Sequence, residues 1–185
     1  MLGAPAGSAT RPTAQPVREA LFNIIAAEVV GSAFVDLFAG SGAVGVEALS
    51  RGAATVVFAE NEGTRLRVIR DNLRLVGARE QEWLVMNTDL TRDLPLRAVG
   101  SCVKKRADAD CVCIIFADPP YSFENLAALP ARISDSFAFR NELTLIIEHY
   151  KKTGLPQNTG GLTLYNEKKY GDTLLSFYRR AETGE

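Results

Sequence analysis

The residues with the clearest chemical potential are the four that follow an apolar run, Asp118-Pro119-Pro120-Tyr121. The run from Cys111 to Ala117 has no polar alternation, which predicts a parallel strand buried on both faces. Two prolines cannot donate to a ladder, and Pro119 disfavours helix at Asp118, so this acid is expected at the carboxyl edge of the sheet. Open α/β sheets bind their ligands at that edge.

A second stretch that could bind a ligand is a glycine turn, Gly40-Ser41-Gly42-Ala43-Val44-Gly45, which follows Asp36. Glycine lets backbone amides approach a ligand, and the N-terminus of the following helix favours negative charge. Together with Glu60 downstream, this turn satisfies the dinucleotide-binding fingerprint. The same geometry serves any adenosine-containing cofactor, because the acid can accept the ribose hydroxyls and the turn can face a carboxylate.

The corner at Asp118 favours methyl transfer to an exocyclic amine over hydride transfer. The amine of guanine or adenine is a poor nucleophile because its lone pair is delocalised into the ring. The Asp118 carboxylate and the Pro119 carbonyl could accept its hydrogens, and Tyr121 offers a face for stacking. Three alternatives stay open at this point: an NAD-dependent oxidoreductase, a non-catalytic RNA-binding module and a small-molecule methyltransferase.

Composition limits the remaining classes. The chain has 185 residues and a net charge of −1, which indicates one globular domain and argues against a generally basic nucleic-acid binder. No apolar run approaches ~18 residues, which excludes a membrane-spanning helix. Met1–Thr10 has no Lys or Arg, so we expect a flexible leader rather than a secretory signal, a single domain over residues 11–185, and a cytoplasmic protein.

Metal and hydrolase chemistry have little support in the sequence. The three cysteines show no paired metal spacing, and His149 is the only histidine, so no metal is expected. Cys111 and Cys113 are expected as buried thiols on one face of a strand. Hydrolase chemistry would have to recruit His149, and no Gly-x-Ser-x-Gly elbow is present. Short basic groups are expected as solvated surface: Lys104–Arg106, Lys151–Lys152, Lys168–Lys169 and Arg179–Arg180.

Alternating strands and helices must position these residues. Periodicity predicts a first helix with Pro16 in its first turn, closed by Gly31-Ser32, then helices over Val44–Ser50 and through Leu66, Ile69, Leu73 and Val76. Residues 91–110 predict a helix fragment and a surface loop, and Ser122–Arg140 a helix interrupted by Pro130. Strands are predicted at Ala33–Phe38, Thr55–Glu60, Trp83–Asn87, 111–117 and Leu143–Glu148, followed by an antiparallel hairpin of Leu162–Lys169 and Thr173–Tyr178. This order predicts a three-layer α/β sandwich with a mostly parallel sheet.

Three motifs in this order resemble the RsmD family: Arg11-Pro12-Thr13 with Val17-Arg18-Glu19-Ala20-Leu21-Phe22-Asn23, then Asp36-Leu37-Phe38-Ala39-Gly40-Ser41-Gly42, then Asp118-Pro119-Pro120-Tyr121. The resemblance runs from about Arg11 to the end of the chain. It implies a Rossmann-like S-adenosylmethionine-dependent methyltransferase fold. It also implies an enzyme that acts as a monomer on ribosomal RNA or the small ribosomal subunit, modifying the 2-amino group of a guanine. An adenine amino group, or an amine of another RNA or DNA, is the alternative target.

The resemblance also implies a role for each matching residue. Asp118 through Tyr121 correspond to the target-amine motif, Asp89 to the acid near the adenine amino group, and Arg11 and Arg18 to a segment beside the RNA. The residues implied for S-adenosylmethionine are Asp36, Phe38, Gly40, Ser41, Gly42, Glu60, Asn61, Asp89 and Thr13.

The sequence departs from the family's pattern at its start. The family usually places a basic hairpin ahead of Arg-Pro-Thr, whereas Met1–Thr10 has no positive charge. Gln15 and Pro16 stand where an acid and a base are more usual. Both departures concern RNA contact more than cofactor binding.

Overall fold

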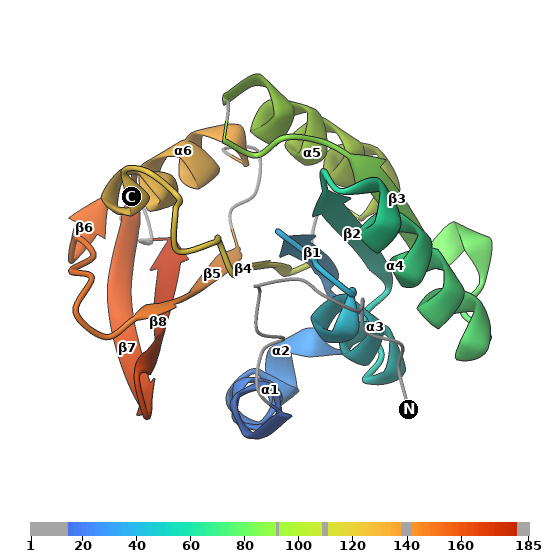
Figure 1. Cartoon of the computed structure of the whole chain (residues 1–185), viewed down its shortest axis with the longest axis horizontal. Helices are drawn as coiled ribbons and strands as arrows, with labels where there is room; N and C mark the ends of the chain where they lie inside the picture. The colour runs from blue at the N-terminus through green and yellow to red at the C-terminus, as the bar shows by residue number, and fades with distance from the viewer. Residues whose placement is uncertain (1–14, 92, 109–110, 138–141, 181–185) are drawn as a thin grey trace.

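The computed structural model describes residues 15–91, 93–108, 111–137 and 142–180. These residues form one eight-stranded sheet with helices on both faces (Figure 1). The expected leader, Arg11 and Thr13 lie outside the described residues.

The sheet has the strand order β3-β2-β1-β4-β5-β8-β7-β6. The first five strands in this order are parallel, and β8 runs antiparallel to both β5 and β7. The predicted mostly parallel sheet with an antiparallel terminal hairpin is therefore confirmed. The strands are β1 (Ala33–Leu37), β2 (Thr55–Glu60), β3 (Trp83–Asn87), β4 (Cys113–Ala117), β5 (Leu143–Tyr150), β6 (Asn158–Thr159), β7 (Leu162–Tyr170) and β8 (Thr173–Arg180).

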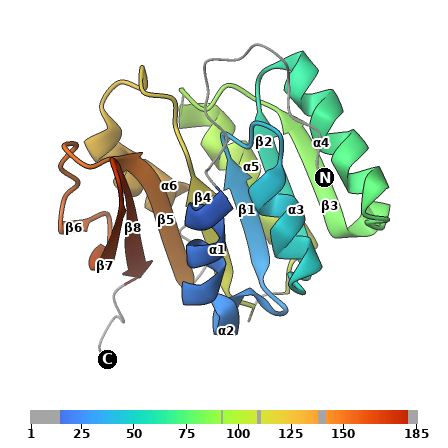
Figure 2. The ribbon, with the colours of Figure 1, turned by 60° about the horizontal axis from the view of Figure 1, so that its bottom comes forward.

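Helices cover both faces of this sheet (Figures 1 and 2). Helices α1, α3 and α4 pack on one face, whereas α5 and α6 pack on the other. In β1, Phe34 belongs to the first of these two cores and Val35 to the second. Because each face of the sheet is covered by helices, the central strands need apolar residues on both faces. The helical segments are α1 (Gln15–Ile24), α2 (Ala26–Val29), α3 (Ala43–Ser50), α4 (Gly63–Leu75), α5 (Asp93–Arg106) and α6 (Leu129–Ser136), with short 3₁₀ turns η1 (Glu80–Glu82) and η2 (Leu126–Ala128).

Three expectations for the second half of the chain were wrong. Residues 93–106 form the continuous helix α5, because Pro95 lies in the first turn, where a missing N–H is tolerated. Pro130 also occupies the first turn of its helix, so it begins α6 instead of interrupting it. Cys111 precedes β4 and is not part of the strand, although it packs against the same core as Cys113.

Two candidate features are absent from the part of the chain that the structure describes. No helix there combines the length and the apolar character that crossing a membrane requires. No three His, Cys, Asp or Glu side chains among those residues are grouped so that they could hold a metal ion.

Candidate functional site

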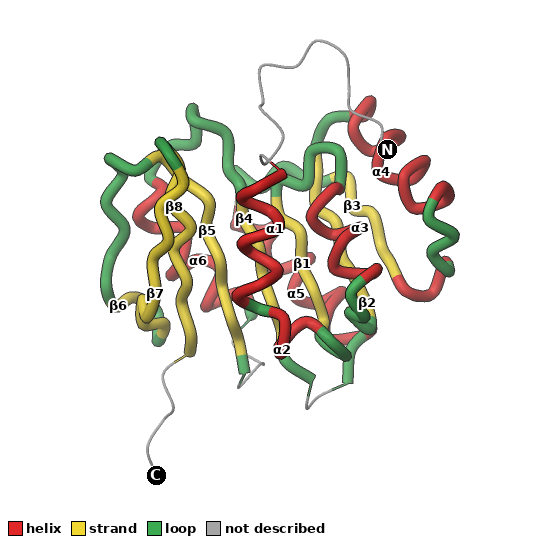
Figure 3. Tube along the Cα trace, turned by 90° about the horizontal axis from the view of Figure 1, so that it is seen from below, coloured by secondary structure: helices red, strands yellow, loops and turns green. Residues whose placement is uncertain are grey.

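The parallel topology brings the predicted site residues to one edge of the sheet. Strands β1, β2, β3 and β4 are neighbours and all end at this edge. The glycine turn follows β1, Glu60 ends β2, Asp89 follows β3 and Asp118 follows β4. Figure 3 shows the connecting loops along this edge, which we call the carboxyl edge.

The glycine turn is built from conformations and contacts that only glycine fits. Gly40 and Gly42 have φ angles of 56° and 75°, and Gly42 is the N-cap of α3. A Cβ at Gly45 would lie 2.3 Å from Cε1 of Phe58, so the glycine lets α3 pack directly on β2. The turn and the helix N-terminus are thereby held against the sheet, which suits an anionic ligand.

Asp36 ties β1 to the first turn of α3. Its side chain is buried, and its Oδ2 accepts a hydrogen bond of 2.9 Å from the backbone N–H of Gly45. Burial raises the pKa of Asp36 to about 8; the Gly45 N–H opposes this rise, whereas the charge of Glu60 adds to it. Asp36 is therefore buried beneath the glycine turn, which it holds through its hydrogen bond to Gly45.

Replacing Asp36 with asparagine is expected to flatten the dependence of stability on pH. Between the ordinary value of 3.8 and about 8, the folded protein keeps a proton that the unfolded chain has lost. The unfolding free energy of the wild type therefore falls as pH rises, by at most about 1.4 kcal/mol per pH unit from this group. Asparagine keeps an oxygen for Gly45 and cannot ionise. Urea unfolding of both proteins between about pH 5 and pH 7 tests this, and parallel curves would contradict it.

Glu60 connects the end of β2 with the glycine turn. Its Oε2 accepts a 2.9 Å hydrogen bond from Gly40 N–H and lies 3.6 Å from Arg65. Its Oε1 accepts from the N–H groups of Asn61 and Glu62 at 2.9 and 3.0 Å. This carboxylate fixes two of the loops that meet at the carboxyl edge.

Asn72 is a residue of this site that sequence reasoning missed. It is buried on α4, and its Nδ2 donates a 3.0 Å hydrogen bond to the carbonyl of Ser41 in the glycine turn. A sequence signal did exist, because this amide interrupts the apolar stripe of the helix between Ile69 and Leu73. A polar side chain on a buried stripe needs a partner, and here the partner is the turn.

Asp89 and Asn61 lie at the carboxyl edge in local turns. Oδ1 of Asp89 accepts from the backbone N–H and the hydroxyl of Thr91, at 3.0 and 2.7 Å. Asn61 is exposed directly after β2. The structure thus brings both residues to the predicted edge, where Asp89 is half-buried and Asn61 is exposed.

The loop after β4, residues 118–123, contacts the end of β1 and Phe38, which lead into the glycine turn. The N–H of Asp118 donates to the carbonyl of Leu37 at 3.4 Å, and Phe123 N–H closes a turn onto the Pro120 carbonyl at 2.8 Å. The rings of Phe123 and Phe38 meet edge to face, with their centroids 5.4 Å apart. Phe38 holds a left-handed φ of 61°, a strained conformation that orients its ring toward this contact.

Tyr121 and Arg18 differ in how they meet solvent. The Tyr121 side chain is 88% exposed at the tip of the loop after β4, so its ring face is accessible. Arg18 is half-buried, and its Nε donates to Oε2 of Glu47 at 2.6 Å, linking α1 to α3. The structure therefore places Arg18 in a bond between two helices, not on an open surface.

His149 does not form a hydrolase site. Its Nε2 lies 2.8 Å from Oγ of Ser176, and that hydroxyl donates to Oε1 of Glu167 at 2.9 Å. Ser176 is fully buried between β5 and β7, so no substrate reaches it. Burial lowers the pKa of His149. These three side chains form a polar network, the β5–β8–β7 network, that joins three strands.

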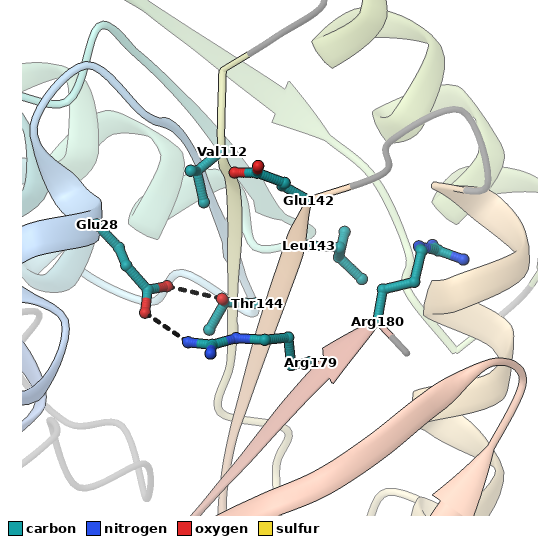
Figure 4. Close-up of a pocket in the computed structure, with 7 residues that line it drawn as sticks. All are labelled: Glu28, Val112, Glu142, Leu143, Thr144, Arg179 and Arg180. Atoms are coloured by element: carbon teal, nitrogen blue, oxygen red, sulfur yellow. Dashed lines mark hydrogen bonds and ion pairs between the residues drawn. The ribbon is translucent and has the colours of Figure 1, made fainter. Parts of the chain in front are cut away.

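A separate hollow of about 320 Å³ lies at the opposite edge of the sheet (Figure 4). Glu28 of α2 crosses it, accepting hydrogen bonds from the Thr144 hydroxyl at 2.7 Å and from Arg179 at 2.9 Å. These bonds attach α2 to β5 and β8. The lining residues are Glu28, Val112, Glu142, Leu143, Thr144, Arg179 and Arg180.

Comparison with known proteins matches one family over almost the whole chain. The model of the family described as "Conserved hypothetical protein 95" matches residues 1–179. The Bacillus subtilis (strain 168) protein YlbH is 31% identical over 179 residues, which cover 97% of this chain and 92% of that protein. "Ribosomal RNA small subunit methyltransferase D" of Escherichia coli (strain K12) is 30% identical over 184 residues, covering 100% and 86%.

Comparison with a solved structure provides evidence on the fold. The crystal structure of an RNA methyltransferase from Salinibacter ruber, in complex with S-adenosyl-L-homocysteine, has a TM-score of 0.59 at 14% identity, covering 95% of this chain and 97% of that one. This likeness concerns the fold alone, and it confirms the predicted Rossmann-like methyltransferase fold. Because the family model and relatives at 30% identity or more span nearly the whole sequence, the chain belongs to the RsmD family.

Proposed function

We propose that this protein is an S-adenosylmethionine-dependent methyltransferase that modifies the 2-amino group of a guanine in small-subunit ribosomal RNA. The observation that carries the proposal is the contact of the loop after β4 with the segment that leads from β1 into the glycine turn, through Phe123 and Phe38 and through Asp118 N–H and Leu37. One loop suits the cofactor and the other suits a planar amine. The name of the Escherichia coli relative supports ribosomal RNA as the substrate.

The residues around the glycine turn fit S-adenosylmethionine. The N-terminus of α3, with no side-chain cap at Gly42, suits the carboxylate of the methionine part. The Glu60 carboxylate suits the ribose, and Asp89 and Asn61 lie where the adenine would reach. The cofactor supplies an electrophilic methyl group on a sulfonium. The demethylated product, S-adenosyl-L-homocysteine, is present in the crystal structure of the Salinibacter ruber RNA methyltransferase.

The loop after β4 suits the reacting amine. We assign the Asp118 carboxylate and the Pro119 carbonyl as acceptors of the two amine hydrogens, which localises the nitrogen lone pair toward the methyl group. Pro120 fixes the backbone beyond them, and the exposed Tyr121 offers a stacking face for a base turned out of its helix. Orientation and electrostatics therefore supply the rate.

Leucine in place of Phe123 is expected to lower kcat while leaving cofactor affinity nearly unchanged. Without the ring, the loop after β4 loses its edge-to-face contact with Phe38, and Asp118 is held less accurately. A displacement of this kind costs on the order of tenfold or more in rate. Rapid-quench kinetics and calorimetric titration of S-adenosylmethionine separate the two effects. Phe123→Tyr keeps the ring and should restore kcat; equal losses in both variants would contradict this role.

A methylation assay with nucleoside analysis tests the proposed reaction. The purified protein, S-adenosylmethionine with a labelled methyl group, and small-subunit RNA or subunits lacking the modification are incubated together. The expected product after digestion is N2-methylguanosine at a single position. Methyl on an adenine amino group would contradict the guanine assignment, and no transfer to any RNA would contradict the function.

We also propose that the protein acts as a monomer. We further propose the cytoplasm as its location, since ribosomal RNA is the proposed substrate.

A further inference from the structure

The terminal hairpin brings basic residues to the carboxyl edge beside the loop after β4. Strand β5 ends at Tyr150, which is in register with Thr173 at the start of β8, and Thr173 is in turn in register with Tyr170 at the end of β7. The end of β5, the start of β8 and the end of β7 therefore lie side by side, at the same edge of the sheet as the end of β4 (Figures 2 and 3). Three spacings of ~4.8 Å separate β7 from β4 across the sheet, and β5 runs three residues past Ile147, the partner of Ala117. At ~3.3 Å per residue, the ends of β7 and β4 therefore lie roughly 17 Å apart.

Four lysines lie in this hairpin and in the turn after β5, and we call them the hairpin lysines: Lys151, Lys152, Lys168 and Lys169. Lys152, Lys168 and Lys169 are exposed, whereas Lys151 is bonded to Asp172 at 2.6 Å. The nearby acids are engaged or partly covered. Lys151, and more weakly Lys169, lowers the pKa of Asp172. Glu167 accepts from Ser176, and Glu148 is half-buried.

The hairpin is held rigidly enough to present these charges. The β5–β8–β7 network links His149, Ser176 and Glu167 across three strands directly behind the tip. Leu175 is buried between Glu148 and Lys168 in register. The lysine stems therefore project from a packed sheet, not from a loose loop.

We propose that the hairpin lysines bind phosphates of the RNA segment that flanks the target nucleotide. This inference rests on the proposed function, because an RNA whose base reaches Asp118 must pass over neighbouring parts of the same edge. Phosphates are the groups that exposed ammonium ions recognise, and such contacts position the strand without reading its sequence. Lys168 and Lys169 are consecutive in β7 and start from opposite faces of the sheet, so each would contact a different phosphate at the tip. Among the described residues, this hairpin extends the carboxyl edge beyond Tyr121 with exposed positive charge.

The double variant Lys168→Gln, Lys169→Gln tests the inference. Each lost phosphate contact lowers the slope of log affinity against log salt by about 0.7 for a single strand, so the slope should fall by about 1.4. The KM for RNA should rise about tenfold, with kcat and the Kd for S-adenosylmethionine within about twofold of wild type. Salt titration of RNA binding and steady-state kinetics provide these values.

A matched control removes the same charge elsewhere. Lys104 and Lys105 are exposed in the last turn of α5. The next residue, Arg106, donates to the carbonyl of Trp83 at the start of β3, so this turn lies at the opposite edge of the sheet. Lys104→Gln with Lys105→Gln should leave KM and the salt slope unchanged.

The possible outcomes separate this inference from the proposed function. If the wild type methylates RNA and both double variants match it in KM and salt slope, the hairpin lysines do not bind the substrate. If both variants lose affinity equally, binding reflects overall charge and the inference is overturned. If the wild type methylates no RNA, the proposed function fails, and the salt slopes of RNA binding still decide whether the hairpin is an RNA surface. Binding of a ribosomal protein, but not of RNA, to the hairpin would also overturn it.

Discussion

Alanine in place of Asp118 is expected to abolish detectable methylation while S-adenosylmethionine still binds with nearly wild-type affinity. The proposed role of Asp118 is to accept a hydrogen from the target amine, an interaction that strengthens as the nitrogen becomes positive. Loss of one such electrostatic partner costs on the order of a hundredfold to a thousandfold in kcat. The described cofactor residues lie on or directly after β1, β2 and β3, so their contacts do not depend on this side chain.

The loop should survive this substitution. The hydrogen bond that attaches Asp118 to Leu37 comes from the backbone N–H, which alanine retains, and Phe123 still packs on Phe38. A thermal unfolding curve close to wild type would show that the loss is chemical. Asp135→Ala, on the exposed side of α6, is the matched control and should leave kcat unchanged.

Single-turnover methylation and calorimetric titration measure the two halves of this expectation. Asp118→Asn adds a finer test, because the amide keeps one acceptor oxygen but carries no charge. Its rate should lie between those of wild type and Asp118→Ala. Near-normal turnover of the alanine variant would remove Asp118 from the reaction, whereas lost cofactor binding would show that it acts mainly on the cofactor side.

The sequence predicted most of the carboxyl edge because each motif follows a strand that is easy to recognise. Strands β1 and β4 are buried along their full length, so their residues are apolar except for Asp36 in β1. Parallel strands end at one edge, and the loops that follow them meet there. The placements of Asp36, Glu60 and Asp118 thus follow from chain order and strand type alone.

Contacts between distant side chains could not be predicted in this way. The bond from Asn72 to Ser41 and the contact of Phe38 with Phe123 depend on how a helix or loop packs onto the sheet. The ion pair of Arg18 with Glu47 likewise depends on the packing of α1 beside α3. Periodicity indicates which face of an element is buried, but not which partner it meets.

Helix α5 illustrates a different limit. Pro95 and Gly100 suggested a broken segment, yet Leu96, Val99 and Val103 carry a helical stripe that is buried on the sheet. Packing of that stripe outweighs the weak propensity of a single glycine, which costs about 1 kcal/mol. Burial of the apolar stripe against the sheet therefore determined that this segment is one helix, although the local sequence signals conflicted.

Alanine in place of Glu60 is expected to raise the Kd for S-adenosylmethionine about a hundredfold. A carboxylate that accepts hydrogen bonds from a ligand contributes roughly 1.5–3 kcal/mol per bond. Three backbone N–H groups already occupy this carboxylate, from Gly40, Asn61 and Glu62. A carboxylate offers about four acceptor positions, so the position that remains, on Oε2, suits one ribose hydroxyl.

The same contacts predict a structural cost that must be separated from the binding effect. Alanine leaves the N–H of Gly40 without its acceptor, which loosens the glycine turn as well as removing the ribose partner. Glu60→Gln helps to separate the two effects, because its single acceptor oxygen can hold Gly40 N–H, whereas its NH2 group then faces the N–H donors of Asn61 and Glu62. We expect it to raise the Kd by about tenfold, with a melting temperature between those of the wild type and Glu60→Ala.

Glu62 provides the control, because it is exposed two residues further along and pairs with Arg65 at 2.8 Å. Its alanine variant should keep the wild-type Kd. Calorimetric titration of S-adenosylmethionine into all three variants gives the comparison, with thermal unfolding of each in the absence of cofactor. An unchanged Kd in Glu60→Ala would exclude Glu60 from the ribose site. A Kd raised equally in the alanine and glutamine variants would instead show that the negative charge, and not the number of acceptor positions, determines how tightly the cofactor is held.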